Sequence, residues 1–551
     1  MPWTMKGQQP EAFNISSTIQ ALSNQISNPH HTSYYVTIIA ILFCAWFFKP
    51  NTKRTRISAP FYKASRIKWM FNADSLIKDS YSKAHSTYQI KSTEGVRVII
   101  PPSLVGQLKG LPEDVLSAKT AVQEAMLSEY THLSADDHAD TLTLLIKTKA
   151  TRNLARMVPD LKDELEYVLS SEFPTSEDWK PIKLQPFMVR TVSRLSGRAF
   201  VGPTLCRSEE WMNVSINFAI TAFIAVVKLQ FFSPWMRPMA QFLVGELRTI
   251  RKDLAKAQKM LQPTIEDRLA KAEQSTDYEK PDDFIQWLSD ALPDNEKRNY
   301  YIQAKVQLLL SASSIHTTSN LTTDCIYDLA VHQDMQEVLR EEALEAFGTD
   351  GSGWEEKDSI PKLKKMDSFI KESQRLSGNT TSFIRKVMKS IDLSDGTHLP
   401  TGTNILAPLS GVALDERYFP EPEIFDGLRF WRLCQQREAA SSESLPQLAS
   451  PPSSRSSSPS RQQQEQANAN GNVPYHFTSI GDTNMDFGLG RHACPGRFFA
   501  AHEIKLILAY LLLHYEIKLP DGAKRPKPVS FMMTRAPSQT AEVLFRCRKG
   551  T

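Results

Sequence analysis

The residue with the most informative surroundings is Cys494, in the run FGLGRHACPGRFFA (487–500), which is followed by an apolar, probable helix. A thiolate that binds iron from a loop needs backbone N–H groups pointing at its sulfur. Gly488, Gly490 and Gly496 permit the tight turns and the close backbone approach of such a loop. The start of a helix directly after the cysteine is expected to lower the pKa of its thiol. The alternative is a buried structural cysteine in a glycine-rich turn.

The same run resembles the haem-binding signature of the cytochrome P450 superfamily, F-x-x-G-x-[RH]-x-C-x-G-x-x-x-A. The positions that match are Phe487, Gly490, His492, Cys494, Gly496 and Ala500. The resemblance implies haem b (iron protoporphyrin IX) as the cofactor, with Cys494 as the axial ligand of its iron. Three further motifs earlier in the sequence also match the family and occur in its order, so the resemblance covers nearly the whole chain.

The haem propionates of such a protein need cations. His492 in the cysteine loop is the first candidate, and Arg385 in SFIRKV is the second. The W-x-x-x-R motif that the family carries on an early helix is absent, and Lys147, Lys149 and Arg152 lie in about the right region.

Two further motifs resemble structural parts of the family. Glu372 and Arg375 in KESQR form its E-x-x-R pair, and at i, i+3 they share one face of a helix. Arg429 in FDGLRF corresponds to the arginine that joins this pair. The resemblance implies a buried salt-bridge network, whose role is structural because buried charges are costly unless each one is paired.

The segment SSIHTT (313–318), in a long helical stretch, resembles the family's oxygen-activating segment [AG]-G-x-[DE]-T-[TS]. Thr317 takes the place of the Thr that hydrogen-bonds dioxygen and helps to deliver protons. Ser314 replaces the usual Gly, and His316 replaces the usual acid. The pKa of a histidine is close to neutrality, so His316 is a candidate proton relay. The alternative is that His316 bonds a propionate or a backbone carbonyl.

These motifs predict a haem-thiolate monooxygenase that uses O2 to oxidise a C–H bond. Only about 50 residues follow the cysteine loop, so the resemblance implies an NADPH-cytochrome P450 reductase as electron donor. WKPIKL, GRAFVGPTLCRSEEW and IHTTS are similar to fungal P450s of secondary metabolism, including oxidases of ent-kaurene. The expected substrate is an apolar terpenoid, meroterpenoid or polyketide. The alternative is a haem-thiolate protein that catalyses a rearrangement without inserting oxygen, or a haem sensor.

The elements that must position these residues are mainly helices, with a minor β-sheet. The chain reads as mostly helical over 110–380, with long helices over 296–330, 333–347 and 361–376. Short strands are predicted over 383–392 and 404–408, separated by turns at Asp395-Gly396 and 400–402. No alternating βαβ pattern and no repeat is present. This is the expected cytochrome P450 fold, preceded by one transmembrane helix.

The N-terminal region predicts a membrane anchor. Residues 34–48 (YYVTIIAILFCAWFF) carry no charge and are directly followed by Lys49, Lys53, Arg54 and Arg56, whereas Lys6 is the only earlier Lys or Arg. We therefore expect a luminal tail over 1–33, with an N-glycosylation sequon at Asn14, and a catalytic domain over 49–551 on the cytosolic face of the endoplasmic reticulum. The alternative is a buried core helix or a signal peptide.

Composition adds two expectations. Residues 435–472 are rich in Ser, Gln, Pro and Asn and nearly free of apolar side chains, so they are predicted to form a disordered surface insert. The net charge of +4 over 551 residues gives no reason to expect a nucleic-acid partner. The six scattered cysteines argue against a disulfide framework or a structural zinc site.

Overall fold

The computed structural model describes residues 57–84, 86–134, 138–348, 352–356, 359–443 and 476–548. The predicted anchor over 34–48 and the sequon at Asn14 lie outside these residues. The long helices are α3 (Arg66–Ala84), α8 (Thr151–Glu172), α9 (Leu184–Cys206), α10 (Glu209–Gln230), α12 (Gly245–Gln274), α14 (Tyr300–Val331), α15 (Gln333–Phe347), α17 (Lys364–Ser377), α19 (Arg429–Glu443) and α21 (Arg497–His514). Shorter helices are α4 (Pro102–Leu108), α5 (Ala118–Ala125), α6 (Ser128–Thr131), α7 (Ala139–Leu145), the π-helix η2 (Ile146–Ala150), α11 (Arg237–Ala240), α13 (Phe284–Ala291), α16 (Ser359–Lys362) and α18 (Leu409–Val412).

The strands form one larger sheet and three small ones. The six-stranded sheet has the order β1 (Phe61–Tyr62), β2 (Tyr88–Ser92), β3 (Gly95–Ile99), β9 (Asn404–Ala407), β6 (Ser382–Val387) and β4 (Leu116–Ser117). Only the pairs β1–β2 and β3–β9 are parallel. The small sheets contain β10 (Tyr515–Lys518), β13 (Glu542–Cys547) and β5 (Lys180–Lys183); β11 (Val529–Phe531) and β12 (Thr534–Ala536); and β7 (Ile391–Asp392) and β8 (His398–Leu399).

The predicted elements compare well with this architecture. The helix expected over 296–330 is α14, and the helix expected over 333–347 is α15. The stretch 361–376 divides into α16 and α17. The strand expected over 383–392 is interrupted after Val387, because β6 pairs with β9 whereas β7 turns back on β8.

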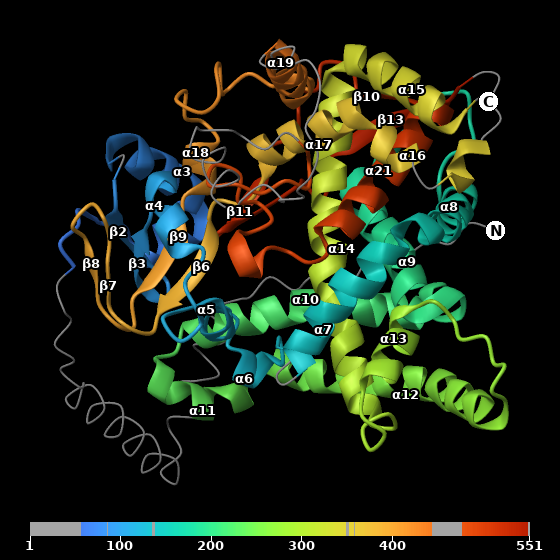
Figure 1. Ribbon diagram of the computed structural model, residues 1–551, viewed down its shortest axis with the longest axis horizontal. Coiled ribbons are helices and arrows are strands. Elements are labelled where there is room, and N and C mark those ends of the chain that lie inside the picture. Colours follow the sequence, from blue (N-terminus) through green and yellow to red (C-terminus); the bar gives the residue numbers. More distant parts are fainter. Residues whose placement is uncertain are drawn as a thin grey trace, which may run out of the picture. The chain divides into compact units, whose positions relative to one another are not determined.

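Helix α14 is the central element. It runs between the sheet-rich part of the domain and helices α8 and α9 (Figure 1). It packs against α9, α10, α12, α17 and α21, so buried side chains occur on most of its circumference. A helix that is buried all round lacks a strongly polar face, and this explains why LLLSASSIHTTSNL carries small polar and apolar residues but no Asp, Glu, Lys or Arg.

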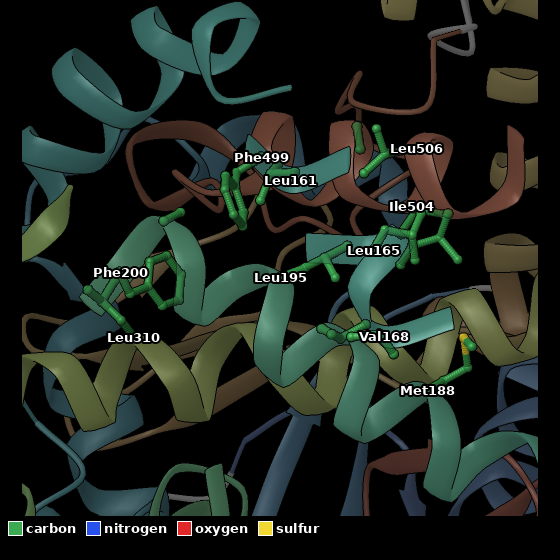
Figure 2. Packing of buried hydrophobic residues seen from close by; sticks show 14 of the residues in the cluster. Leu161, Leu165, Val168, Met188, Leu195, Phe200, Leu310, Phe499, Ile504 and Leu506 are labelled. Carbon is green, nitrogen blue, oxygen red and sulfur yellow. The ribbon is translucent and has the colours of Figure 1, made fainter. Parts of the chain in front are cut away.

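Helices α8, α9, α14 and α21 share one apolar core. Figure 2 shows Leu165 and Val168 of α8 beside Leu195 of α9 and Ile504 of α21. Phe200 of α9 and Phe499 of α21 stack with their ring centroids 5.7 Å apart. This core fixes α21, and with it the cysteine loop, against α14.

Helix α10 is long and apolar enough to span a membrane by length and composition, and it is the one helix of the described ranges that meets this criterion. It begins at Ser208, whose hydroxyl accepts a hydrogen bond from the Trp211 N–H. Half of its apolar window is buried in the fold, where it packs against α9, α12 and α14. It is therefore a core helix with one exposed apolar face.

Helix α19 extends to Glu443 and therefore continues into the segment expected to be disordered from residue 435. The first nine residues of that predicted insert, 435–443, are helical, which corrects the predicted boundary. The low apolar content of 435–443 suggested disorder, but Gln, Arg, Glu and Ala in this stretch have high helix propensity and continue the helix that begins at Arg429. The rest of the predicted insert, 444–472, lies outside the described residues.

Candidate functional site

The cysteine loop folds back on itself just before α21. The N–H of Cys494 donates to the carbonyl of Phe487 at 2.7 Å, and the N–H of Gly488 donates to Met485 at 2.8 Å. Gly488 has φ +70° and Gly490 has φ +68°, values that a side chain disfavours. A Cβ at Gly490 would also collide with the carbonyl oxygen of Lys109. Both positions therefore require glycine for a backbone reason.

Gly496 differs from the other two glycines. Its φ of −86° is open to any residue, so the backbone conformation does not require glycine here. A Cβ at Gly496 would meet no protein atom within 4 Å, and the residue lines a cavity beside Cys494. The absence of a side chain leaves open space next to the sulfur, and a flat macrocycle bound through that sulfur requires such space.

Burial raises the pKa of the Cys494 thiol, although N–H groups of Gly496 and Arg497 hydrogen-bond the sulfur and act in the opposite direction. The expectation of a lowered pKa is therefore wrong for the protein by itself, because burial outweighs the helix N-terminus. The N–H groups do point at the sulfur, as an iron thiolate requires. A metal cation deprotonates a coordinating thiol outright, so the surroundings of Cys494 fit an axial ligand of haem iron.

The cavity beside Cys494 has a volume of about 490 Å³. Cys494, Phe487 and Gly496 form part of its wall, and Ser313, Ser314 and Thr317 of α14 form another part. Its apolar lining includes Leu142, Ile146, Phe200, Phe284, Leu309, Leu310 and Leu321. The structure thus places the sulfur and the SSIHTT segment around one mainly apolar space, which is the arrangement that the two motifs imply.

Thr317 lines the cavity, and its hydroxyl donates to the carbonyl of Ser313 at 2.7 Å. A hydroxyl that donates to its own helix keeps its lone pairs free to accept a hydrogen bond from a group in the cavity. Thr317 is therefore placed to act on a bound ligand.

His316 points elsewhere. It does not line the cavity, and its Nε2 lies 3.0 Å from the carbonyl oxygen of Ile216 on α10. Burial lowers the pKa of His316, so the ring is neutral at pH 7. The structure favours the alternative of a histidine bonded to a backbone carbonyl over the proton relay. The sequence did not decide this, because adjacent residues of a helix face directions about 100° apart.

The two predicted propionate cations lie near each other, with different partners. His492 Nε2 lies 2.6 Å from Glu113 Oε1, and burial followed by the nearby Arg385 lowers the pKa of the imidazole. Arg385 is buried, its guanidinium donates to the carbonyls of Ile384 and Leu489, and within the described ranges it forms no ion pair. Lys147 is close enough to lower the pKa of His492 further. Arg385 is thus the cation best suited to a haem carboxylate.

Glu372, Arg375 and Arg429 come together in the buried network that their motifs imply. Glu372 is fully buried and accepts two hydrogen bonds from Arg375, at 2.7 and 2.8 Å, and one from Arg429 Nε at 3.1 Å. The remaining N–H groups of the two arginines donate to carbonyls, which include Pro422 and Ile424. Because each charge is paired, the network holds α17 to the segment that leads into α19.

Sequence reasoning missed the exposed Glu113, the partner of His492, and the buried carboxyl of Glu503 on α21. Glu113 belongs to no motif and becomes relevant only through the fold. Glu503 left a signal in the sequence, because it is one of few charged residues in the apolar run RFFAAHEIKLILAYLLL. A charge at a core position of a helix is rarely buried without a specific partner.

Comparison with known proteins agrees with this site. The family model for cytochrome P450 matches residues 135–446 and 462–545. A cytochrome P450 monooxygenase of Emericella nidulans, AN1598, is 32% identical over 476 residues, which cover 86% of this chain and 83% of the relative. Monooxygenase braC of Annulohypoxylon truncatum is 32% identical and covers 94% of this chain and 97% of its own length.

Two other similarities are informative. The ent-kaurene oxidase of Gibberella intermedia is 31% identical over 88% of this chain and 85% of its own length. The solved structure of retinoic acid-bound cyanobacterial CYP120A1 superposes with a TM-score of 0.62 at 16% identity, covering 89% of this chain and 99% of that one. That structure supports the fold alone. The chain belongs to the cytochrome P450 family and is a P450 monooxygenase.

Proposed function

We propose that this monooxygenase oxidises an apolar secondary metabolite of the terpenoid, meroterpenoid or polyketide class. When bound, haem b with its thiolate ligand supplies the activation of O2 and the oxidation of a C–H bond. The observation that carries the proposal is the lining of the cavity that would hold haem b and substrate together, where leucine, isoleucine and phenylalanine side chains lie with Cys494 and Thr317. An apolar cavity with few polar groups selects an apolar ligand.

The similarity to fungal relatives supports the substrate class. One of them is an ent-kaurene oxidase, and ent-kaurene is an apolar diterpene hydrocarbon. In this chain, Phe200 and Phe284 line the cavity, with ring centroids 6.4 Å apart. These rings would offer a rigid surface to a fused-ring substrate. Hydroxyl groups on the lining come mainly from α14, next to Thr317.

The test is a binding and turnover assay of the full chain with an NADPH-cytochrome P450 reductase as electron donor. ent-Kaurene, a prenylated phenol and a reduced polyketide serve as probes. We expect one class to give a low-to-high spin shift and an oxygenated product that depends on both NADPH and the reductase. Turnover that needs neither NADPH nor O2 would contradict the monooxygenase assignment, whereas binding of polar metabolites alone would contradict the substrate class.

We also propose that the catalytic domain faces the cytosol at the endoplasmic reticulum membrane. The charge asymmetry around residues 34–48 supports this orientation. An apolar surface of the catalytic domain supports contact with lipid, since α10 and the connection to α12 expose Ile220, Phe223, Ile224, Phe231, Trp235, Met239, Phe242 and Leu243. Exposed apolar side chains that gather in one stretch of the chain are typical of a surface that contacts a membrane or a partner.

Glycosylation of Asn14 tests the orientation. If residues 1–33 are luminal, a glycosidase-sensitive mass shift is expected, and Asn14→Gln should abolish it. A protease added to sealed microsomes should then remove the catalytic domain and leave the N-terminal tail protected. Digestion of the tail under these conditions would place it in the cytosol and contradict the proposal.

A further inference from the structure

A buried carboxyl lies behind the cavity and is connected to it by two hydroxyl groups. Glu503 of α21 is completely buried, and both of its carboxyl oxygens hydrogen-bond the hydroxyl of Ser196 on α9, at 3.0 and 3.2 Å. The Ser196 hydroxyl lies 2.8 Å from the hydroxyl of Ser314 on α14. Ser314 lines the cavity one helical turn before Thr317. The chain Glu503–Ser196–Ser314 therefore links the core of the protein to the cavity without a gap.

The side chains around the hydrogen-bonded series Glu503–Ser196–Ser314 keep water and cations away from Glu503. Figure 2 shows Leu195 and Ile504, the sequence neighbours of Ser196 and Glu503, within the packed apolar core of α8, α9, α14 and α21. Throughout the described ranges, Glu503 forms no ion pair. Its pKa responds to burial and to hydrogen bonds with Ser196, and to no charged side chain of the helices that pack around it. The simplest state for an isolated buried carboxyl is the protonated one.

We propose that Glu503 is the proton donor of this monooxygenase and that Ser196 and Ser314 carry its proton into the cavity. Hydroxyl groups both donate and accept, so the hydrogen bonds along Glu503–Ser196–Ser314 can run in either direction. With Glu503 protonated, its O–H donates to Ser196, Ser196 donates to Ser314, and the Ser314 O–H points to an acceptor in the cavity.

The transfer is balanced in one concerted shift. The Glu503 proton moves to Ser196 Oγ, the Ser196 proton moves to Ser314 Oγ, and the Ser314 proton leaves for the acceptor. Glu503 is left as a carboxylate that accepts from Ser196, which in turn accepts from Ser314. Monooxygenation consumes protons together with the electrons that NADPH supplies, so the activity itself uses what this chain delivers. A proton taken up from solvent at Ser314 then passes back through Ser196 and restores the Glu503 acid.

Two features of this protein favour a proton path through Glu503, Ser196 and Ser314. The position that carries an acid in related oxygen-activating segments is occupied by His316, which is bonded to α10 and does not line the cavity. Ser314 stands where those segments carry glycine, and glycine would interrupt the chain at its last step. Burial raises the pKa of Glu503 to about 8, so the carboxyl holds its proton at neutral pH and can still release it.

The first test is independent of turnover. Photolysis of carbon monoxide from the reduced, haem-loaded full chain gives an infrared difference spectrum of groups coupled to the cavity. We expect a carboxylic-acid carbonyl band that shifts in D2O, that disappears in Glu503→Gln and that moves in Ser314→Ala. The matched control is Ser193→Ala, which removes a hydroxyl of α9 that contacts Ser215 of α10 and lies outside the chain. It should leave the band unchanged.

The second test measures where electrons go. With reductase, NADPH and O2 but no substrate, the peroxide released per NADPH should rise roughly threefold or more in Glu503→Gln, Ser196→Ala and Ser314→Ala, but not in Ser193→Ala. The proposal is overturned if the acid band survives in Glu503→Gln. It is also overturned if Ser314→Ala changes neither the band nor the peroxide yield. If Glu503→Gln does not bind haem, the two serine variants decide the outcome.

Discussion

The imidazole of His316 is bonded through Nε2 to the backbone carbonyl of Ile216, 3.0 Å away, and so ties α14 to α10. Thr317, the next residue along α14, lines the cavity instead. Neighbouring residues of one motif thus have different roles, one in packing and one at the site.

His316→Ala should therefore leave the ratio of product to NADPH unchanged. It should lower the free energy of unfolding by about 1 kcal/mol, the usual value of one buried hydrogen bond. Thermal denaturation and a coupling assay measure the two effects. A lower ratio of product to NADPH with an unchanged free energy of unfolding would support a role of His316 in proton transfer and contradict its structural role.

Thr317→Ala should retain haem and bind substrate, yet lose about tenfold or more in product formed per NADPH while peroxide rises. The reason is that the hydroxyl can accept a hydrogen bond from a ligand in the cavity, and a methyl group cannot. Thr317→Ser keeps the hydroxyl and serves as the control, with coupling close to that of the wild type. If Thr317→Ala consumes NADPH with unchanged coupling, Thr317 has no part in the chemistry.

Cys494→Ala should abolish the thiolate band in the reduced carbon monoxide difference spectrum. The sulfur of Cys494 lies on the cavity wall and accepts hydrogen bonds from the N–H groups of Gly496 and Arg497, and an alanine provides no ligand atom at this position. Cys434, which lies on α19 outside the cavity lining, is the matched control, and Cys434→Ala should keep the band. An intact thiolate band in Cys494→Ala would refute the assignment of the ligand.

Glu372→Gln should greatly reduce the yield of folded, haem-loaded protein. The change leaves Arg375 and Arg429 buried without their shared carboxylate, and breaking a buried pair costs about 3–5 kcal/mol. Chemical denaturation and haem content measure the loss. Lys162→Gln, which breaks a more exposed pair with Glu166, should change stability by less than about 1 kcal/mol. Equal losses of stability in the two variants would show that burial does not increase the contribution of the Glu372 network to stability.

Deletion of 444–472 should leave folding and haem binding largely intact, because its Ser-, Gln- and Pro-rich composition has few apolar side chains to contribute to a core. A longer deletion, 435–472, also removes the end of α19 and should be less stable. Circular dichroism and the reduced carbon monoxide spectrum compare the two. Loss of the haem spectrum in the shorter deletion would assign a structural role to the insert.

The sequence by itself determined the family, the candidate cysteine ligand and the order of the main elements. These features are local: the Gly-framed cysteine loop, the E-x-x-R pair at one helical turn, and the long apolar stretch that becomes α14 are each written in neighbouring residues. Arg429 could also be placed, because a motif marks it. The helix boundaries followed from the same local patterns to within a few residues.

Only the tertiary structure decided which neighbouring side chains reach the cavity. The direction of His316 depends on α10 packing against α14, and the partner of His492 depends on Glu113 arriving from another part of the chain. The rise in the pKa of Cys494 is a consequence of burial, which no short pattern contains. Glu503, Ser196 and Ser314 come from three helices that are far apart in sequence. Their hydrogen bonds exist because an apolar core fixes those helices side by side, and contacts of this kind depend on packing across the whole fold rather than on local residue order.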